Sequence, residues 1–141
     1  MKRSLFIILF FGMALLTGYA QASDADKIKA TVTGFAKAAD MNDADKLAGY
    51  LDANYRLVLN RLFGSSEVNI MPREVYLEKI RKKEFGGDTR KVTFDDLIIN
   101  GTTATVKATL KGKKATFISL ITLVQNADGH WKLVSDVPMI K

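Results

Sequence analysis

The order of apolar and polar residues predicts helices in the first part of the chain that follows residue 22. Apolar residues recur at intervals of three and four along residues 28–39, which is typical of one face of an amphipathic helix. Met41-Asn42-Asp43 interrupts this pattern, and the same spacing returns over residues 44–51. Asn42 or Asp43 is a suitable N-cap for the second helix. Together these segments predict a helical hairpin.

A strand and a third helix are expected next. Residues 55–62 are rich in branched and aromatic side chains, which favours a strand, and Gly64-Ser65-Ser66 ends it. Pro72 suits the first turn of a helix, because the amide hydrogen that proline lacks has no partner there. The helical spacing continues to Lys83, and Gly86-Gly87 marks the end of this third helix.

The second half of the chain predicts antiparallel sheet. Asn100-Gly101 is a strong hairpin signal, because the favoured two-residue turn needs positive φ at both positions, and it joins strands at residues 92–99 and 102–110. The second of these strands alternates apolar residues with threonine and lysine, so one face is expected to be buried and the other solvated. The solvated residues are Thr103, Thr105, Lys107 and Thr109. Residues 115–125 carry apolar side chains on both faces, which predicts a strand that is covered on both sides.

The last predicted strand, residues 130–137, contains the only histidine and the only tryptophan of the chain. It follows an Asp128-Gly129 turn, and Trp131 shares a face with Leu133 because side chains alternate along a strand. Pro138 has no amide hydrogen to donate, so pairing is expected to stop there.

The first residues have the three parts of a secretory signal peptide. Met1-Lys2-Arg3 is positively charged, an apolar run extends from Leu5 to Leu16, and Ala20-Gln21-Ala22 offers a cleavage site with small residues. The run is shorter than the roughly 20 residues of a transmembrane helix, although an anchor that stays attached is the alternative. We therefore expect residues 1–22 to be a signal peptide and residues 23–141 to form one exported domain, periplasmic or secreted and free of the membrane after cleavage.

Composition excludes several kinds of chemistry. The chain has no cysteine, which rules out disulfides, thiolate metal sites, a cysteine nucleophile and a lipid-modified cysteine. A single histidine gives poor support for a zinc site or a serine-histidine dyad.

The net charge of +6 includes Lys2 and Arg3 of the predicted signal, so the remaining positive charge is mild and predicts no nucleic-acid partner. Lysine and arginine residues form three local clusters: Arg81-Lys82-Lys83, Arg90-Lys91, and Lys111 with Lys113 and Lys114. Such clusters are typical of a solvated face, and the alternative is that they bind an anionic partner. We predict no cofactor, metal or catalytic residue.

The predicted order of elements indicates an α+β fold with helices against one face of a curved sheet. Five segments resemble the nuclear transport factor 2-like superfamily, and their order and spacing are most similar to the small bacterial family called putative lumazine-binding. These segments are residues 47–57, 72–76, 100–104, 117–123 and 129–133. The resemblance implies a cone-shaped fold, with three helices packed on a strongly curved antiparallel sheet and a pocket at the open end. The superfamily includes isomerases, dehydratases, cyclases, adaptors and binding modules, so this fold alone assigns no activity.

The resemblance also implies roles for individual residues. In the family, the tryptophan that begins the last strand packs between sheet and helices, so Trp131 is expected in the core and His130 on the opposite, solvated face. Members similar to ketosteroid isomerase place a carboxylate base where this chain has Leu57 or Val58, and a hydrogen-bonding tyrosine where it has Phe35. Dehydratase members use an aspartate and histidine pair, but the histidine here is on the wrong element. Both enzyme interpretations are weakened.

Several residues are candidates for the pocket. A two-residue turn at Asn100-Gly101 places Asp95 opposite Val106 on the apolar face, where a carboxylate can orient a ligand. The alternatives are that Asp95 lies in water at the rim, or that the register differs by one. The other candidates are aromatic residues on elements that line the cone in the family, and Ser119, which with Leu120 replaces an acidic residue and a tyrosine of the family. The set is Phe35, Tyr50, Tyr55, Tyr76, Asp95, Phe117 and Ser119.

Three functions are compatible with these patterns. The leading hypothesis is a non-catalytic module that binds a small apolar or aromatic molecule. The alternatives are an isomerase- or dehydratase-like enzyme, and an interaction protein that forms a homodimer through the sheet or meets an anionic surface. The polar face of residues 103–109 suits a weak contact better than a large obligate interface.

Overall fold

The computed structural model of the protein describes residues 22–141. The predicted signal peptide lies outside the described residues except for Ala22. Within residues 22–141, no helix is both long and apolar enough to cross a membrane.

The helical hairpin predicted from the sequence is present. α1 (Asp24–Asp40) begins at Ser23, whose hydroxyl accepts a hydrogen bond from the Asp26 amide, and α2 (Ala44–Ala48) is capped in the same way by Asp43. The buried face of α1 carries the apolar stripe seen in the sequence: Ile28, Val32, Phe35, Ala36 and Ala39. α2 is shorter than predicted, because the sheet already begins at Leu51.

The third helix, α3 (Arg73–Arg81), differs from the prediction at both ends. Pro72 is the residue before the helix, in extended conformation, rather than part of its first turn. The helix ends before Lys83 because this residue adopts a left-handed conformation with φ of 60°. The amides of Lys83 and Glu84 then donate to the carbonyls of Ile80 and Lys79 at 3.0 and 2.9 Å, which is a Schellman motif. The reversal directs the following segment back toward α1.

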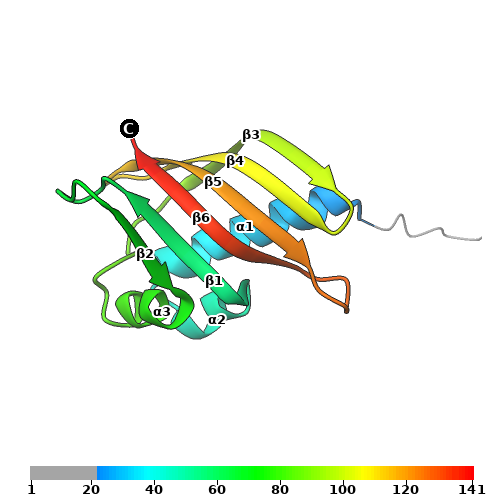
Figure 1. The fold of residues 1–141 in the computed structure, drawn as a ribbon, viewed down its shortest axis with the longest axis horizontal. Helices are drawn as coiled ribbons and strands as arrows, with labels where there is room; N and C mark the ends of the chain where they lie inside the picture. Colours follow the sequence, from blue (N-terminus) through cyan, green and yellow to red (C-terminus); the bar gives the residue numbers. More distant parts are fainter. Residues whose placement is uncertain (1–21) are drawn as a thin grey trace, which may run out of the picture.

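Six strands form one sheet that curves around α1 (Figure 1). They are β1 (Leu51–Asn60), β2 (Val68–Pro72), β3 (Lys91–Asn100), β4 (Thr103–Lys111), β5 (Thr116–Gln125) and β6 (Trp131–Ile140), in the order β2-β1-β6-β5-β4-β3. The sheet is antiparallel apart from the parallel pair of β1 and β6. The sequence did not predict β2, which is a five-residue edge strand. In Figure 1, α2 and α3 lie together near the start of β1.

The register predicted for the β3–β4 hairpin is wrong. Leu97, and not Asp95, lies opposite Val106. The pairing skips Asp95, which is the extra residue of a β-bulge, and such a residue is left out of the ladder. Asp95 is exposed and accepts a hydrogen bond of 2.7 Å from the Thr109 hydroxyl. It therefore lies outside the apolar interior, as in the alternative considered above.

Two further predictions about β5 and β6 are wrong, and one is confirmed. The outer face of β5 is open, with Leu120 51% exposed, so this strand is covered on one side only. Pairing continues past Pro138 to Ile140, since Pro138 takes a place opposite Ser119 within the ladder. Trp131 is buried at 3% exposure and His130 is exposed, as expected.

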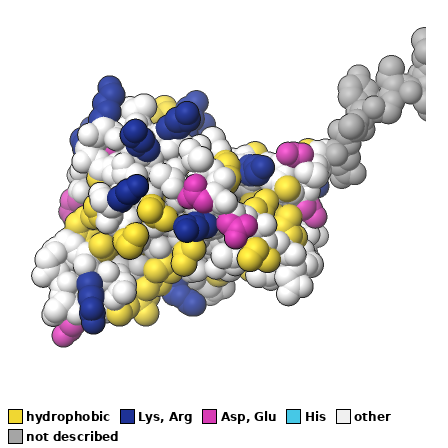
Figure 2. Space-filling view, turned by 90° about the horizontal axis from the view of Figure 1, so that it is seen from above, with side chains coloured by type: hydrophobic (Ala, Val, Ile, Leu, Met, Phe, Trp, Pro, Cys, Tyr) yellow, Lys and Arg dark blue, Asp and Glu magenta, His cyan; other side chains and the backbone are white. Residues whose placement is uncertain are grey.

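The concave face of the sheet and the three helices enclose a single apolar core. Its largest fully buried side chains include Tyr55, Phe35, Ile28, Leu47, Ile121 and Leu133. On the surface, lysine and arginine side chains lie among acidic and hydrophobic ones on the face shown in Figure 2, as expected for a mild charge excess. Ser119 and Asp136 are the two buried polar residues among residues 22–141.

Candidate ligand-binding site

A cavity of about 350 Å³ opens between the concave face of the sheet and the segment that follows α3. Its volume lies in the range of about 300–1,000 Å³ that is typical of small-molecule sites. Most of the wall is apolar and comes from α1, β1, β4 and β5, through Phe35, Ala39, Leu57, Leu59, Leu110 and Phe117. Tyr76 and residues 83–86 of the segment after α3 form the other side.

Sheet register places both buried polar residues in this cavity. Asp136 on β6 lies opposite Ile121 on β5, and Ser119 lies two residues away on the same strand and therefore on the same face. Diagonal neighbours of this kind are within reach of one another. Asp136 is 6% exposed and Ser119 is 2% exposed, and both line the cavity. An otherwise apolar wall thus contains one carboxyl and one hydroxyl group.

The Asp136 carboxyl group is perturbed by its surroundings. Burial raises its pKa from 3.8 to about 6, although a hydrogen bond with Ser119 and the charge of Arg90 act in the opposite direction. Its Oδ1 atom is buried and has no hydrogen-bond partner in the described structure. A buried acceptor without a partner is destabilising, so a donor group on a bound molecule would be favoured here.

A row of aromatic rings leads from the core to the mouth of the cavity. The ring centroids of Tyr55 and Tyr76 are 5.6 Å apart, those of Tyr76 and Phe85 are 6.4 Å apart, and those of Phe85 and Phe63 are 6.0 Å apart. These separations are typical of attractive aromatic pairs. Burial raises the pKa of both tyrosines above the ordinary value, so each hydroxyl remains a hydrogen-bond donor. Flat apolar surface is therefore available to a ligand along this wall.

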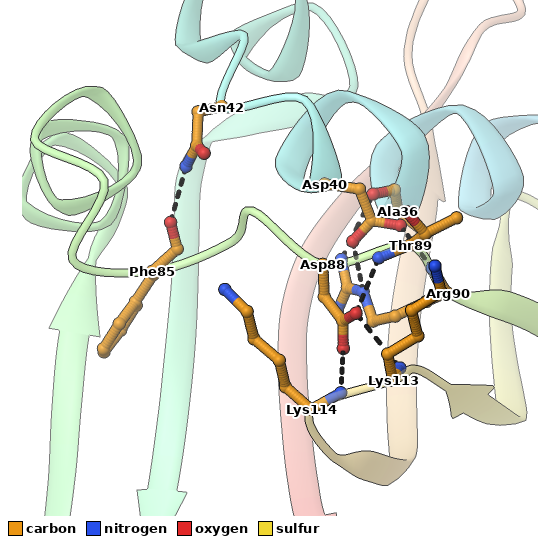
Figure 3. A network of polar contacts seen from close by, with 9 residues as sticks. All are labelled: Ala36, Asp40, Asn42, Phe85, Asp88, Thr89, Arg90, Lys113 and Lys114. Atoms are coloured by element: carbon orange, nitrogen blue, oxygen red, sulfur yellow. Dashed lines mark hydrogen bonds and ion pairs between the residues drawn. The ribbon is translucent and has the colours of Figure 1, made fainter.

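The segment that closes the cavity after α3 is fixed to α1. The Asn42 side-chain amide donates to the carbonyl oxygen of Ile80 at 3.1 Å. It also donates to the carbonyl oxygen of Phe85 at 2.6 Å (Figure 3). Gly86 has φ of 78° and approaches the helix so closely that a Cβ atom would lie 2.1 Å from the Ala39 carbonyl oxygen. Only glycine fits this approach without a shift of the backbone.

The same segment is also fixed at its far end. The Arg90 guanidinium forms an ion pair of 2.5 Å with Asp40 and donates to the Ala36 carbonyl oxygen at 3.1 Å. The Asp88 carboxylate accepts hydrogen bonds from the backbone amides of Lys113 and Lys114, both at 3.0 Å (Figure 3). These amide bonds lower the pKa of Asp88. The wall is held on both sides, so the cavity does not depend on a ligand for its shape.

The structure brings four of the seven predicted pocket residues to the cavity. Phe35, Tyr76, Phe117 and Ser119 line it. Tyr55 is buried in the adjacent core, and its hydroxyl has no partner in the described structure. Tyr50 packs instead on α1 beside Gly34, where a Cβ atom would lie 2.4 Å from the Tyr50 Cζ atom. Asp95 is on the outer surface, as described above.

The sequence pattern missed Asp136, the most perturbed acidic residue of the cavity. Strict alternation from Trp131 and Leu133 would place Ser135 on the inner face and Asp136 on the outer face. A bulge intervenes, because Leu133 and Ser135 pair with adjacent residues of β5 and Val134 is skipped. The extra residue turns Asp136 inward. A cluster of aspartate and serine in the last strand was the only signal in the sequence.

This arrangement can hold a molecule that is largely apolar and has a hydrogen-bond donor at its inner end. A carboxyl group with a pKa of about 6 can also accept a proton near neutral pH, which is the property that a general base needs. Among residues 22–141, no three histidine, cysteine or acidic side chains are grouped to hold a metal ion. The exposed His130 does not line the cavity.

Comparison with solved structures defines the class of fold. The chain is similar to a nuclear transport factor 2-like (NTF2-like) protein of unknown function from Shewanella baltica, with a TM-score of 0.71 and 13% identity over 86% of this chain and 98% of that one. A second NTF2-like protein of unknown function, from Silicibacter pomeroyi, has a TM-score of 0.70 and 16% identity over 82% of this chain and 93% of that one. A ketosteroid isomerase-like protein from Erwinia carotovora atroseptica has a TM-score of 0.63 and 14% identity over 80% of this chain and 92% of that one. The fold is therefore NTF2-like.

The family is defined more narrowly by the sequence. Residues 23–137 match the model of the family described as putative lumazine-binding, and the chain belongs to that family. The comparison with curated proteins gives no match. Both the superfamily and the family that the sequence resembled are thus confirmed.

Proposed function

We propose that this protein is a non-catalytic module that binds a small apolar or aromatic molecule in the cavity of its cone. The observation that carries the proposal is the buried Asp136 Oδ1 atom, which lines a preformed apolar cavity and has no hydrogen-bond partner within residues 22–141. A preformed, mostly apolar cavity with a few polar groups is the usual design of a small-molecule site. The family description and an NTF2-like fold agree with such a role.

Native mass spectrometry tests this proposal directly. The protein would be expressed with its own N-terminal residues, purified gently and measured under native and denaturing conditions. We expect an added mass on the folded protein that is lost on denaturation. The same spectrum tests our proposal that the protein is exported and cleaved after Ala22, since the polypeptide mass would correspond to residues 23–141.

A matched pair of variants assigns any bound mass to the cavity. Ala115→Trp places a large side chain on a residue that lines the cavity, whereas Thr116→Trp adds the same side chain to the next residue, which does not line it. We expect Ala115→Trp to abolish the adduct and Thr116→Trp to keep it. An adduct that survives Ala115→Trp, or its absence from the wild-type protein, would contradict the proposed function.

An isomerase-like activity is a second candidate, which the raised pKa of Asp136 favours. The cavity contains an acidic side chain and a tyrosine, which are two of the three groups that a ketosteroid isomerase-like site uses. The test is to incubate the recovered molecule with the wild-type protein and with Asp136→Asn. A change in its chromatographic retention with the wild type alone would establish turnover, and an unchanged molecule would leave binding as the function.

A homodimer through the sheet is a further proposal, and the outer face of β2, β1, β6 and β5 favours it. Ile70 pairs with Val58, and Val137 pairs with Leu120, so apolar side chains cross four strands on one face. Ile70 is 63% exposed and Leu120 is 51% exposed. A two-fold axis would place this patch against its own copy and leave the threonines and Lys107 of β4 at the rim.

Light scattering coupled to size exclusion tests the dimer. We expect twice the monomer mass for the wild type, and the monomer mass for Leu120→Lys. Thr105→Lys adds the same charge to the polar part of the outer face and should leave the mass unchanged. A wild-type protein that stays monomeric at high concentration would contradict the proposal.

A further inference from the structure

Two lysines from different elements border the cavity and have no acidic partner within the described structure. Lys83 follows α3, and Lys114 belongs to the turn between β4 and β5. Both side chains are exposed, and neither takes part in an ion pair among residues 22–141. Figure 3 shows Lys114 extending along the segment between Phe85 and Asp88, with its Nζ atom pointing toward that segment.

The other charges around the cavity are already engaged. Glu84 forms an ion pair of 2.6 Å with Lys79, and Arg90 is paired with Asp40. Asp88 accepts two backbone hydrogen bonds from the turn that contains Lys114. Asp136 is the remaining charged group, and it lies in the buried part of the cavity. The two lysines are therefore the charges that are most available to a bound molecule at the mouth.

The backbone of Lys83 supports a functional role for its side chain. Lys83 occupies the left-handed position of the Schellman motif, with φ of 60°, where glycine is strongly preferred. A lysine is disfavoured in this conformation, because its Cβ crowds the backbone. A disfavoured conformation that borders a cavity is a reason to look for function in the side chain. Glycine at this position would improve the helix end but remove a cation from the mouth.

We propose that the ligand is an aromatic or otherwise planar apolar molecule with one anionic group, and that Lys83 and Lys114 hold this group at the mouth. The inference rests on the proposed binding function and names the class of ligand. The row of Tyr76, Phe85 and Phe63 supplies flat surface for the apolar body. The anionic group must face outward, because Asp136 in the buried part would repel it and its desolvation would be costly.

Two dyes that differ by a single group test this inference. 8-Anilinonaphthalene-1-sulfonate is an aromatic anion, and N-phenyl-1-naphthylamine is the same molecule without the sulfonate. Titration of each dye followed by fluorescence gives its affinity. The test variant is Lys83→Gly with Lys114→Gln, and the control is Lys82→Gln with Lys113→Gln, which removes the same charge from the adjacent lysines that do not line the cavity.

We expect the test variant to weaken binding of the sulfonate dye by roughly 3- to 10-fold, as for two exposed ionic contacts, and to leave the neutral dye unchanged. The control variant should leave both dyes unchanged. Lys83→Gly should also raise the unfolding midpoint, so a loss of binding cannot come from misfolding. Equal effects on both dyes, or no effect on the sulfonate dye, would overturn the inference while the binding function stands. If neither dye binds, or if Ala115→Trp weakens neither, the inference about the class of ligand fails, and the native mass spectra decide the binding function separately.

Discussion

Replacing Asp136 with asparagine should stabilise the folded protein at neutral pH. The carboxyl group has a pKa of about 6 in the folded state and an ordinary value near 3.8 when it is solvated. Each pKa unit corresponds to about 1.4 kcal/mol, so ionisation of the buried group destabilises the fold by about 3 kcal/mol. Asparagine has nearly the same shape as aspartate and does not ionise, so the variant avoids this destabilisation.

The sign of the pH dependence follows from the two pKa values. Between about pH 4 and pH 6 the folded state holds more protons at Asp136 than the unfolded state, so wild-type stability falls as pH rises through this window. Above this pH window the contribution of Asp136 to the free energy of unfolding is constant. The variant lacks this titration, whereas the other groups titrate alike in both proteins. The difference in free energy of unfolding, variant minus wild type, should therefore rise by about 3 kcal/mol from pH 3.5 to pH 7.5.

Urea unfolding at a series of pH values and constant ionic strength measures this difference. Trp131, the only tryptophan, is buried and provides a fluorescence signal for the transition. Asp95→Asn is the matched control, because that carboxylate is exposed and should give no comparable gain. A difference that stays flat between pH 4 and pH 7 would refute our view that Asp136 ionises inside the cavity.

Three other substitutions test the packing around the site. Gly34→Ala should lower the free energy of unfolding by up to about 2 kcal/mol, because the new Cβ meets the Tyr50 ring at 2.4 Å, which costs about 1–3 kcal/mol, whereas alanine regains about 1 kcal/mol inside a helix. Tyr50→Leu in the same chain should recover part of that loss in urea unfolding. Trp131→Ala should lower the free energy of unfolding by about 3–5 kcal/mol, measured by circular dichroism. His130→Ala should change it by no more than about 0.5 kcal/mol, because this side chain is on the surface. Similar values for the two variants would contradict the assignment of Trp131 to the core and His130 to the surface. Asp40→Ala should lower the thermal midpoint, since it leaves the partly buried Arg90 guanidinium without its ion-pair partner, at a cost below the roughly 3–5 kcal/mol of a fully buried pair. A midpoint unchanged within error would show that the segment after α3 is held by other contacts.

The binding and dimer proposals depend on different parts of the molecule and can be separated. Binding depends on the cavity and Asp136, the dimer depends on the outer face around Leu120, and the class of ligand depends on Lys83 and Lys114. A variant of the outer face leaves the cavity intact, and a variant of the cavity leaves the outer face intact. The experiments therefore assign each property to its own surface.

The sequence by itself determined the helices, the order of most strands and the family. The stripe of α1 and the burial of Trp131 are local properties, because spacing of three and four residues in a helix, or of two in a strand, decides which side chains share a face. Gly86-Gly87 was predicted to end the third helix, but the helix already ends at Arg81, before the left-handed conformation of Lys83. No pattern of apolar residues signalled the short edge strand β2, whose residues are largely exposed.

Only the tertiary structure decided which carboxylate lies inside the cone. Asp95 was predicted on the inner face and Asp136 was overlooked, and a β-bulge accounts for each case. Asp95 is the extra residue of one bulge, and Val134 is the extra residue that turns Asp136 inward in the other. Since side chains alternate with a period of two, one added residue moves every later side chain of the strand to the opposite face. The position of a bulge depends on how neighbouring strands pair and bend, so the sequence of a single strand does not reveal it.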